Sequence, residues 1–191
     1  MDNTTIIFHP YSLTRPQEQL ETWKVLDCLN RMYPVYHHLC AKPDDYDKGL
    51  ASRWNKGYDL IIIEQDIVPT LDMIRNLVHF QALIAAQAYY LYTIENEPVI
   101  AHRCYTDNMA TRWIEPEETQ AHLIGLGLAY FSKKSQSLVD LTTLSPNRRW
   151  DNLDVRLSQA FYAQGLTFNI HYPVVTHNHR ETPDSYRGLC I

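Results

Sequence analysis

The stretch DLIIIEQDIVPT, residues 59–70, decides the fold of this protein. A short, continuous apolar run bounded by turn residues is typical of a strand that is buried on both faces. The run leads directly into Glu64, Gln65 and Asp66, with Pro69 just beyond. Carboxylates are rarely placed at the end of a buried strand without a partner. The stretch therefore predicts a central strand and, at its end, a candidate site.

The sequence before this strand alternates between strand and helix patterns. The predicted order is strand, helix, strand, helix, strand, at residues 4–8, 15–34, 34–39, 44–57 and 59–66. Pro10 is expected to break the first strand and Gly57 to end the second helix. The apolar face of the first helix is predicted to consist of Leu20, Trp23, Leu26 and Leu29. This alternation favours parallel strands with helices packed on the faces of the sheet.

The second half of the chain continues with six further elements. They are a helix within residues 69–80, a strand or helix at 82–93, a helix at 115–124, a strand at 125–134, a helix at 150–165 and a strand at 166–175, followed by a polar tail. The helix at 150–165 has the clearest pattern, because Asp151 suits the N-cap and Gly165 suits the C′ position. Its expected buried face is Leu153, Leu157 and Phe161. Without repeats or linkers, the 191 residues are predicted to form one α/β domain.

Composition narrows the classes of function. The net charge is −5 and the basic residues form no stripe, which disfavours strong nucleic-acid binding and attachment to anionic lipid. The four cysteines are scattered, which favours reduced thiols and a cytoplasmic protein. The N-terminus lacks the pattern of a signal peptide, and the most apolar segment, residues 83–94, is too short to span a membrane.

Glu64 and Asp66 form the first candidate site. Ligands of open parallel sheets bind beyond the carboxyl ends of the strands, where these carboxylates lie together with His9 and Tyr11. Hard oxygen ligands suit Mg²⁺ or Mn²⁺, which bridge to phosphate oxygens. Glu64 is also suited to hold a sugar hydroxyl, and a plain surface turn is the alternative without function.

Late histidines form the second candidate site. His171, His177 and His179 lie in or near the last predicted strand, and positions 177 and 179 face the same way on an extended chain. Imidazole is a common ligand for transition metals, although such histidines also occur in ordinary exposed tails.

The start of the helix at 150–165 is the third candidate. Asp151 has a structural role as the cap. Asp154 follows one turn later and is a candidate general base if it faces the cleft. An acidic first turn that only stabilises the helix N-terminus is the alternative.

The ordered set of YDLIIIEQDIVP, GLGLAYFS, WDNLD and GLTFNIHYPVVTH resembles the GT-A fold of nucleotide-sugar glycosyltransferases, in particular small members from phages and archaeal viruses. The resemblance covers about residues 4–180. It implies a GT-A-like mixed, mostly parallel sheet with helices on both faces, with a nucleotide-binding half at about 1–68 and an acceptor half at about 69–180. A viral protein of this kind is expected in the host cytoplasm.

The resemblance also implies roles for residues. Asp66 corresponds to the metal ligand of the acidic-x-acidic motif, although Glu64 stands where the family usually has Asp. His177 completes the metal site, with His179 as the reserve, and the metal is Mn²⁺ or Mg²⁺. Asp154 is the catalytic base. The residues that bind the nucleotide are His9, Pro10, Tyr11 and Glu64.

By this resemblance the protein moves a sugar from a nucleotide-diphosphate sugar to an acceptor that is a glycan, a protein or a nucleobase. Two other readings stay open. A non-catalytic binding or assembly protein with a GT-A-like frame is one. A metal-dependent nuclease or phosphoesterase is the other, because THNHRE contains His-Asn-His, but the net acidic charge disfavours it.

Overall fold

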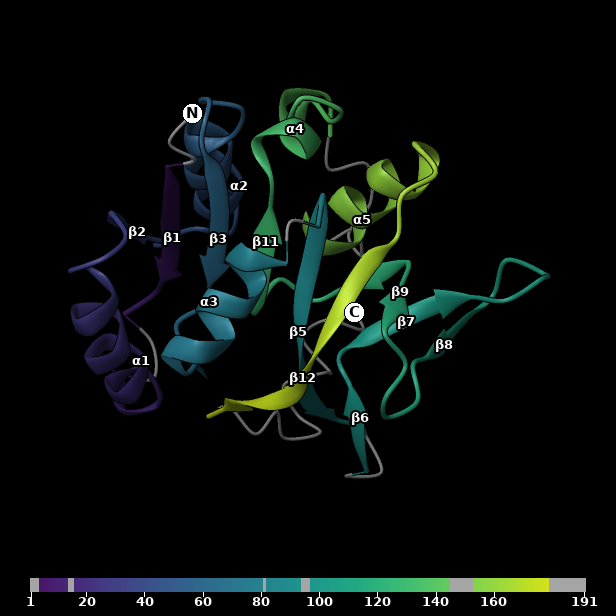
Figure 1. Ribbon diagram of the computed structural model, residues 1–191, viewed down its shortest axis with the longest axis horizontal. Helices are drawn as coiled ribbons and strands as arrows, with labels where there is room; N and C mark the ends of the chain where they lie inside the picture. Colours follow the sequence, from purple (N-terminus) through teal and green to yellow (C-terminus); the bar gives the residue numbers. More distant parts are fainter. Residues whose placement is uncertain (1–3, 14–15, 81, 94–96, 145–152, 179–191) are drawn as a thin grey trace.

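The computed structural model describes residues 4–13, 16–80, 82–93, 97–144 and 153–178 (Figure 1). The helices are α1 (Pro16–Leu29), α2 (Pro43–Arg53), α3 (Leu71–His79), α4 (Lys133–Gln136), the 3₁₀ helix η1 (Leu141–Thr143) and α5 (Leu153–Ala163). The strands are β1 (Thr5–Tyr11), β2 (Val35–Leu39), β3 (Asp59–Ile63), β4 (Ile67–Val68), β5 (Ile84–Tyr92), β6 (Pro98–Ile100), β7 (His102–Tyr105), β8 (Thr111–Trp113), β9 (Gln120–Ala121), β10 (Leu123–Ile124), β11 (Leu128–Phe131) and β12 (Phe168–His177). No described helix is long and apolar enough to cross a membrane.

A mixed, mostly parallel sheet forms the centre of a single α/β domain. Its strand order is β2-β1-β3-β11-β5-β12-β4, with β6 paired to β5 and β9 paired to β12. Strands β2, β1 and β3 are parallel, as are β5 and β12. Strand β11 runs antiparallel between β3 and β5. The predicted β-α-β-α-β start and the sheet class are confirmed, and a smaller sheet, β10-β7-β8, lies beside the main one.

Helices cover both faces of the sheet, as predicted. Strand β3 shows this directly, since Leu60 and Ile62 belong to one core while Ile61 and Ile63 belong to the other, all without exposed surface. Helices α2 and α5 pack on the first core and helices α1 and α3 on the second. The expected face of α5 is confirmed: Leu153, Leu157 and Phe161 are buried. Gly165 has a φ of 73° just beyond the helix, as a C′ residue requires.

Strand β1 continues through Pro10, so the prediction that Pro10 breaks the strand is wrong. Ile7 donates its N–H to the Pro34 carbonyl, toward β2. In a strand, the N–H groups of successive residues point toward opposite neighbouring strands. The nitrogen of Pro10 therefore faces β3, whose pairing with β1 ends at Phe8. Proline therefore removes no bond with β2. The ring Nδ1 of His9 donates to the Ile63 carbonyl, 2.8 Å away, at this end of the ladder.

The buried face of α1 differs from the prediction at Leu20, which is 55% exposed. The residues that are buried instead follow a spacing of three and four: Gln19, Thr22, Leu26 and Leu29. Gln19 is buried because its amide Nε2 donates to the Ser12 carbonyl at 2.9 Å. Hydropathy alone predicts that Leu20 is buried and Gln19 exposed. The hydrogen bond of Gln19 to the loop after β1 favours the opposite arrangement.

The helix predicted at residues 115–124 is wrong. The segment forms a turn followed by the short strands β9 and β10. The Glu118 carboxylate accepts hydrogen bonds from both terminal nitrogens of Arg112, at 2.7 and 2.6 Å, and from the Glu115 N–H at 2.5 Å. These bonds hold the pKa of Glu118 at about 2. The acidic residues that suggested the first turn of a helix therefore belong to a turn in which Glu118 is paired with Arg112.

Two smaller predictions are also settled by the structure. The segment 82–93, which fitted either a strand or a helix, contains strand β5. Helix α2 ends at Arg53, before Gly57, and Asn55 is the first residue beyond it with a positive φ, 54°. Among the described residues, Cys28, Cys40 and Cys104 form no disulfide.

Candidate active site

The candidate site begins at the turn between β3 and β4, which contains Glu64, Gln65 and Asp66. The Glu64 N–H donates to the Gly127 carbonyl at 2.9 Å, and the Ile67 N–H donates to the Glu64 carbonyl at 3.2 Å. These bonds fix the turn against the start of β11. The carboxylates therefore lie at the carboxyl end of β3, where the sequence placed them.

The structure brings His177 to Asp66. The His177 Nε2 lies 3.4 Å from Asp66 Oδ2, and only 9% and 14% of the two side chains are exposed. The Asn178 N–H donates to the Asp66 carbonyl at 2.8 Å, which fixes the end of β12 beside the turn. Asp66 and His177 are more than a hundred positions apart in the sequence, and the fold brings their side chains into direct contact.

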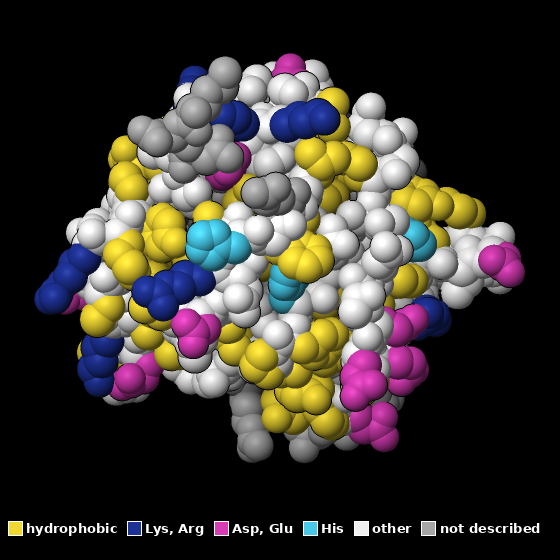
Figure 2. Space-filling view, in the orientation of Figure 1, with side chains coloured by type: hydrophobic (Ala, Val, Ile, Leu, Met, Phe, Trp, Pro, Cys, Tyr) yellow, Lys and Arg dark blue, Asp and Glu magenta, His cyan; other side chains and the backbone are white. Residues whose placement is uncertain are grey.

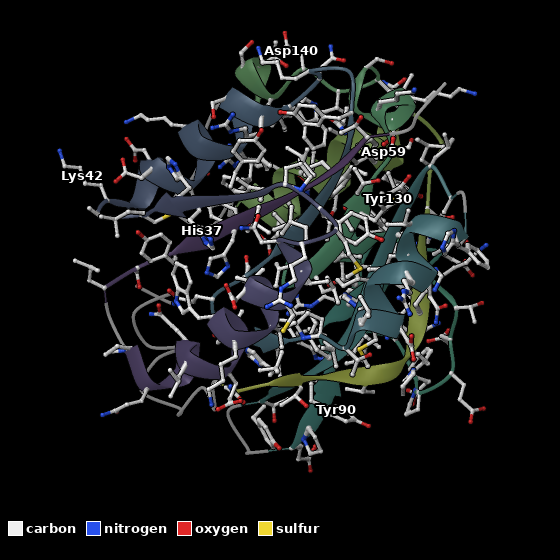
Figure 3. The ribbon with its side chains drawn as sticks, turned by 60° about the vertical axis from the view of Figure 1, so that its left-hand side comes forward. His37, Lys42, Asp59, Tyr90, Tyr130 and Asp140 are labelled. Carbon is white, nitrogen blue, oxygen red and sulfur yellow. The ribbon has the colours of Figure 1, made fainter. Side chains whose placement is uncertain are left out.

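The ring of His177 is oriented by Tyr90. Nδ1 lies 3.1 Å from the Tyr90 carbonyl, and because a carbonyl only accepts, Nδ1 carries a proton. In neutral imidazole this leaves the lone pair on Nε2, the atom that faces Asp66. Burial lowers the pKa of His177, but the hydrogen bond and charge of Asp66 outweigh burial and raise it above its ordinary value. Figure 3 shows Tyr90 at the lower end of the sheet, far from Asp59 at the start of β3.

Burial has the largest effect on the protonation of Glu64. Burial raises the pKa of its carboxyl to about 7, and the charges of Asp66 and Asp154 act in the same direction. The Tyr46 hydroxyl donates to Glu64 Oε1 at 3.0 Å, which lowers the pKa in part. Glu64 is therefore easily protonated near neutral pH and is hydrogen-bonded on one oxygen.

Asp154 belongs to the first turn of α5, where its Oδ1 accepts the Val155 N–H at 2.8 Å. Burial raises its pKa, and helix N–H groups together with Arg103 and Arg156 offset part of that rise. Its charge raises the pKa of both Glu64 and Tyr46, so the carboxylate lies within electrostatic range of these two residues, although it does not line the cavity beside them. Asp151 and His179, the predicted cap and the reserve ligand, lie outside the described residues.

A cavity of about 250 Å³ opens beside the turn. It is lined by Pro10, Tyr11, Ser12, Cys40, Tyr46, Glu64, Gln65 and Asp66. Pro10 and Tyr11, at the end of β1, thus line the cavity together with the carboxylates.

His9 does not line this cavity. Its ring has no exposed surface and packs among aromatic side chains, stacked on Tyr11 at 5.8 Å between ring centres and edge-on to Trp23 at 5.0 Å. Burial lowers its pKa to about 4, so the ring is neutral. His9 therefore packs against the ring of Tyr11 and does not contribute to the wall of the cavity.

Sequence reasoning missed Tyr46, Tyr89 and Gln65. Tyr46 comes from α2 and Tyr89 from β5, and the ring of Tyr89 lies edge-on to His177 with 5.3 Å between ring centres. A Cβ on Gly125 would meet the Tyr89 hydroxyl at 2.0 Å, so glycine is required for this approach. The glycine in GLGLAYFS was the available signal, because glycine in a strand pattern marks a close approach.

A second cavity, of about 450 Å³, lies at the opposite end of β3 and β11. Asp59 in its wall accepts from the Tyr130 hydroxyl at 3.0 Å and from the Lys133 N–H at 2.7 Å, and Figure 3 shows Asp59 and Tyr130 together. Both carboxylate oxygens are thus used, one in a bond to β11 and the other in a bond to the start of α4. On the face that Figure 2 shows, Lys and Arg side chains lie at separate positions and do not join into a stripe.

The residues present fit a divalent cation as a partial ligand set. Among the described residues there is no group of three or more His, Cys, Asp or Glu arranged to hold a metal ion. Asp66 and His177 are a pair at a spacing close to the roughly 3 Å between adjacent ligands of an octahedral ion. Mg²⁺ is commonly held by one or two side chains plus substrate phosphates and water, and Nδ1 bonded to a carbonyl is the usual support of a metal-binding histidine.

No protein-family model matches the sequence, and no curated protein sequence matches it. Solved structures that are similar in fold include the following three. A glycosyltransferase involved in glycosylation of the major capsid of PBCV-1 has a TM-score of 0.49 at 8% identity, covering 89% of this chain and 82% of its own. A Drosophila β1,4-galactosyltransferase 7 mutant in complex with manganese, UDP-Gal and xylobiose has 0.49 at 13%, covering 96% and 73%. The 4-diphosphocytidyl-2C-methyl-D-erythritol synthase of Anaerococcus prevotii has 0.45 at 7%, covering 99% and 98%. At these values the likeness does not assign an activity to this chain.

The raised pKa of Glu64 predicts a pH-dependent stability. The folded state holds the Glu64 proton more tightly than the unfolded chain, so this contribution is fully present below about pH 4.5 and is lost as the pH rises through about 7. Glu64→Gln keeps an acceptor for Tyr46 and removes the titration. We expect the stability of the wild type relative to Glu64→Gln to fall by about 2 kcal/mol between about pH 5 and pH 8.

Urea unfolding of both proteins across this range measures the difference. Asp72→Asn is the matched control, because the Asp72 side chain is 85% exposed on α3. Parallel stability profiles for wild type and Glu64→Gln would show that Glu64 titrates as an ordinary carboxyl.

Proposed function

We propose that this protein is a glycosyltransferase that moves a sugar from a nucleoside diphosphate sugar to an acceptor hydroxyl with the help of Mn²⁺ or Mg²⁺. The observation that supports the proposal most is the Asp66–His177 pair beside the cavity, with Asp154 on α5 near enough for its charge to raise the pKa of Glu64. A cation ligand pair, a carboxylate base and a cleft with an aromatic wall are what this reaction requires of a small protein.

Asp66 and His177 are the residues that would hold the cation in this proposal. When bound, the cation supplies positive charge that stabilises the diphosphate as it leaves the sugar. The Tyr90 carbonyl keeps the His177 lone pair on Nε2 for this purpose.

Glu64 is proposed to bind the ribose rather than the cation. Its Oε1 accepts from Tyr46, and its raised pKa leaves the carboxyl partly protonated near pH 7, which weakens it as a ligand for a cation. A carboxyl group that is readily protonated is well suited to exchange hydrogen bonds with hydroxyl groups.

Asp154 is proposed to take the proton of the acceptor hydroxyl as that oxygen attacks the anomeric carbon. The proton passes to the Asp154 carboxylate, the bond to the diphosphate breaks, and the diphosphate leaves with the electron pair. Arg103 and Arg156 favour the ionised form of Asp154, which a base requires.

Binding and turnover of nucleotide sugars test the proposal. UDP-, GDP-, CDP- and ADP-sugars are screened by thermal shift with Mn²⁺ or with EDTA, and release of nucleoside diphosphate is followed in the same samples. A ligand at one hundred times its Kd adds about 2.7 kcal/mol of stability, which such an assay detects. We expect metal-dependent stabilisation together with slow hydrolysis of the donor.

Two other results would contradict the proposal in different ways. Metal-dependent binding without any sugar release, with acceptors present, would favour a non-catalytic binding protein. Cleavage of plasmid DNA with Mg²⁺ and no response to nucleotide sugars would favour a nuclease.

A further inference from the structure

The side-chain amide of Gln65 has a defined orientation. The Ser12 N–H donates to Gln65 Oε1 at 2.6 Å, and the Ser12 hydroxyl donates to the same atom at 3.1 Å. A backbone N–H can only donate, so the atom that it meets must be the amide oxygen. The amide nitrogen Nε2, with two N–H groups, is left with no hydrogen-bond partner among the residues that the structure describes.

The group that fixes this amide is itself held in place. The Ser12 carbonyl accepts from Nε2 of Gln19, which is only 4% exposed on helix α1. Ser12 therefore joins the loop after β1 to α1 on one side and to the turn after β3 on the other. Donors that are fixed before a ligand arrives discriminate between ligands better than mobile ones.

Gln65 and Ser12 line the same cavity as Pro10 and Tyr11. The next step rests on the proposed function. If the diphosphate lies against Asp66 and His177, the nucleoside extends along the remaining wall of the cavity, which Pro10, Tyr11 and Ser12 form. The ring of Tyr11 offers a surface on which a base can stack, and Nε2 of Gln65 is the amide group left for its edge.

We propose that Gln65 selects the nucleobase of the donor by donating from Nε2 to a base oxygen, so that the site prefers oxo bases to amino bases. A free glutamine amide pairs with adenine through its oxygen and its nitrogen together. Gln65 cannot do so because Ser12 already occupies Oε1 with two hydrogen bonds. It therefore acts as a donor only. Uracil and 6-oxopurines present an oxygen where cytosine and adenine present an amino group.

Two matched pairs of diphosphates test this preference: UDP against CDP, and IDP against ADP. Within each pair the bases are of similar size and the main change at the edge is oxygen against amino group. Kd values are measured by calorimetry with Mn²⁺ at about pH 8. We expect the oxo member of each pair to bind about tenfold more tightly, because an amino group leaves the Nε2 donor without an acceptor.

Gln65→Glu separates selection from structure. The glutamate keeps an oxygen for Ser12 and replaces the Nε2 donor by an acceptor. We expect weaker binding of all four nucleotides because of the added charge, but with the UDP-to-CDP ratio reversed. Gln65→Leu removes both the oxygen that Ser12 binds and the Nε2 donor. It is expected to bring the ratio of UDP affinity to CDP affinity close to one.

The outcomes separate this proposal from the proposed function. Equal affinities within each wild-type pair, or ratios unchanged in Gln65→Glu, would overturn the role of Gln65 while nucleotide binding and sugar transfer stood. Absence of nucleotide binding altogether would overturn both.

Discussion

Asp66→Asn is expected to remove the metal-dependent part of nucleoside diphosphate binding, weakening it by roughly 100-fold or more in the presence of Mn²⁺. Asn keeps the size of the side chain and an oxygen, but it lacks the charge that attracts a divalent ion. With EDTA present, wild type and variant are expected to bind the same nucleotide equally weakly. Calorimetric titration of the diphosphate with Mn²⁺ and with EDTA gives both values.

The design includes a second ligand and a charge control. His177→Ala is expected to give the same pattern, because Nε2 of His177 faces Asp66 at 3.4 Å. Asp72→Asn removes an equal charge from an exposed site and is expected to change nothing. A loss in Asp66→Asn that is as large with EDTA as with Mn²⁺ would show that Asp66 acts without a metal.

The first part of the fold was predictable because its signals are local. In residues 59–63 every side chain is buried, and the four consecutive apolar residues 60–63 predict a strand buried on both faces. Alternation with helices then fixes parallel pairing and places Glu64 at the carboxyl end of β3. The position of the candidate site follows from these steps alone.

The order of the strands was not predictable in the same way. Strand β11 lies between β3 and β5 in the sheet, although β5 comes before β11 in the sequence. The reason is that pairing depends on contacts between distant segments, and no local pattern records them. The same limit applies to the site, since Tyr46 reaches Glu64 and Gln65 reaches Ser12 only in the folded chain.

The errors in helix prediction have one physical cause. Hydropathy and charge alone predict Leu20 in the core and Glu118 in a helix, because neither pattern contains information about hydrogen-bond partners. In the structure Gln19 is buried by its bond to Ser12, and Glu118 is held in a turn by Arg112. Polar side chains with specific partners thus override the average preference of their residue type.

Asp154→Asn is expected to lower the turnover of sugar transfer by roughly 10²–10⁴-fold, the usual contribution of a general base. Asn cannot take the acceptor proton, but its oxygen can still accept the Val155 N–H, so helix α5 should keep its start. Because a base acts in the transition state, donor affinity is expected to stay level. Steady-state kinetics with a transferred product, together with donor Kd, separate the two effects.

Asp151→Asn is the matched control for this prediction, because it makes the same substitution three positions earlier, at the residue that the sequence predicts as the helix cap, and Asn caps a helix about as well as Asp. It is expected to leave turnover close to that of the wild type. If Asp151→Asn stops transfer while Asp154→Asn does not, the base is the other carboxylate. If neither variant changes turnover, transfer does not use a carboxylate base from this helix, and the proposed mechanism of direct attack by a deprotonated acceptor is wrong. A rise in wild-type turnover with pH that is absent in Asp154→Asn would identify the titrating group, because burial raises the pKa of Asp154 and the base must be ionised.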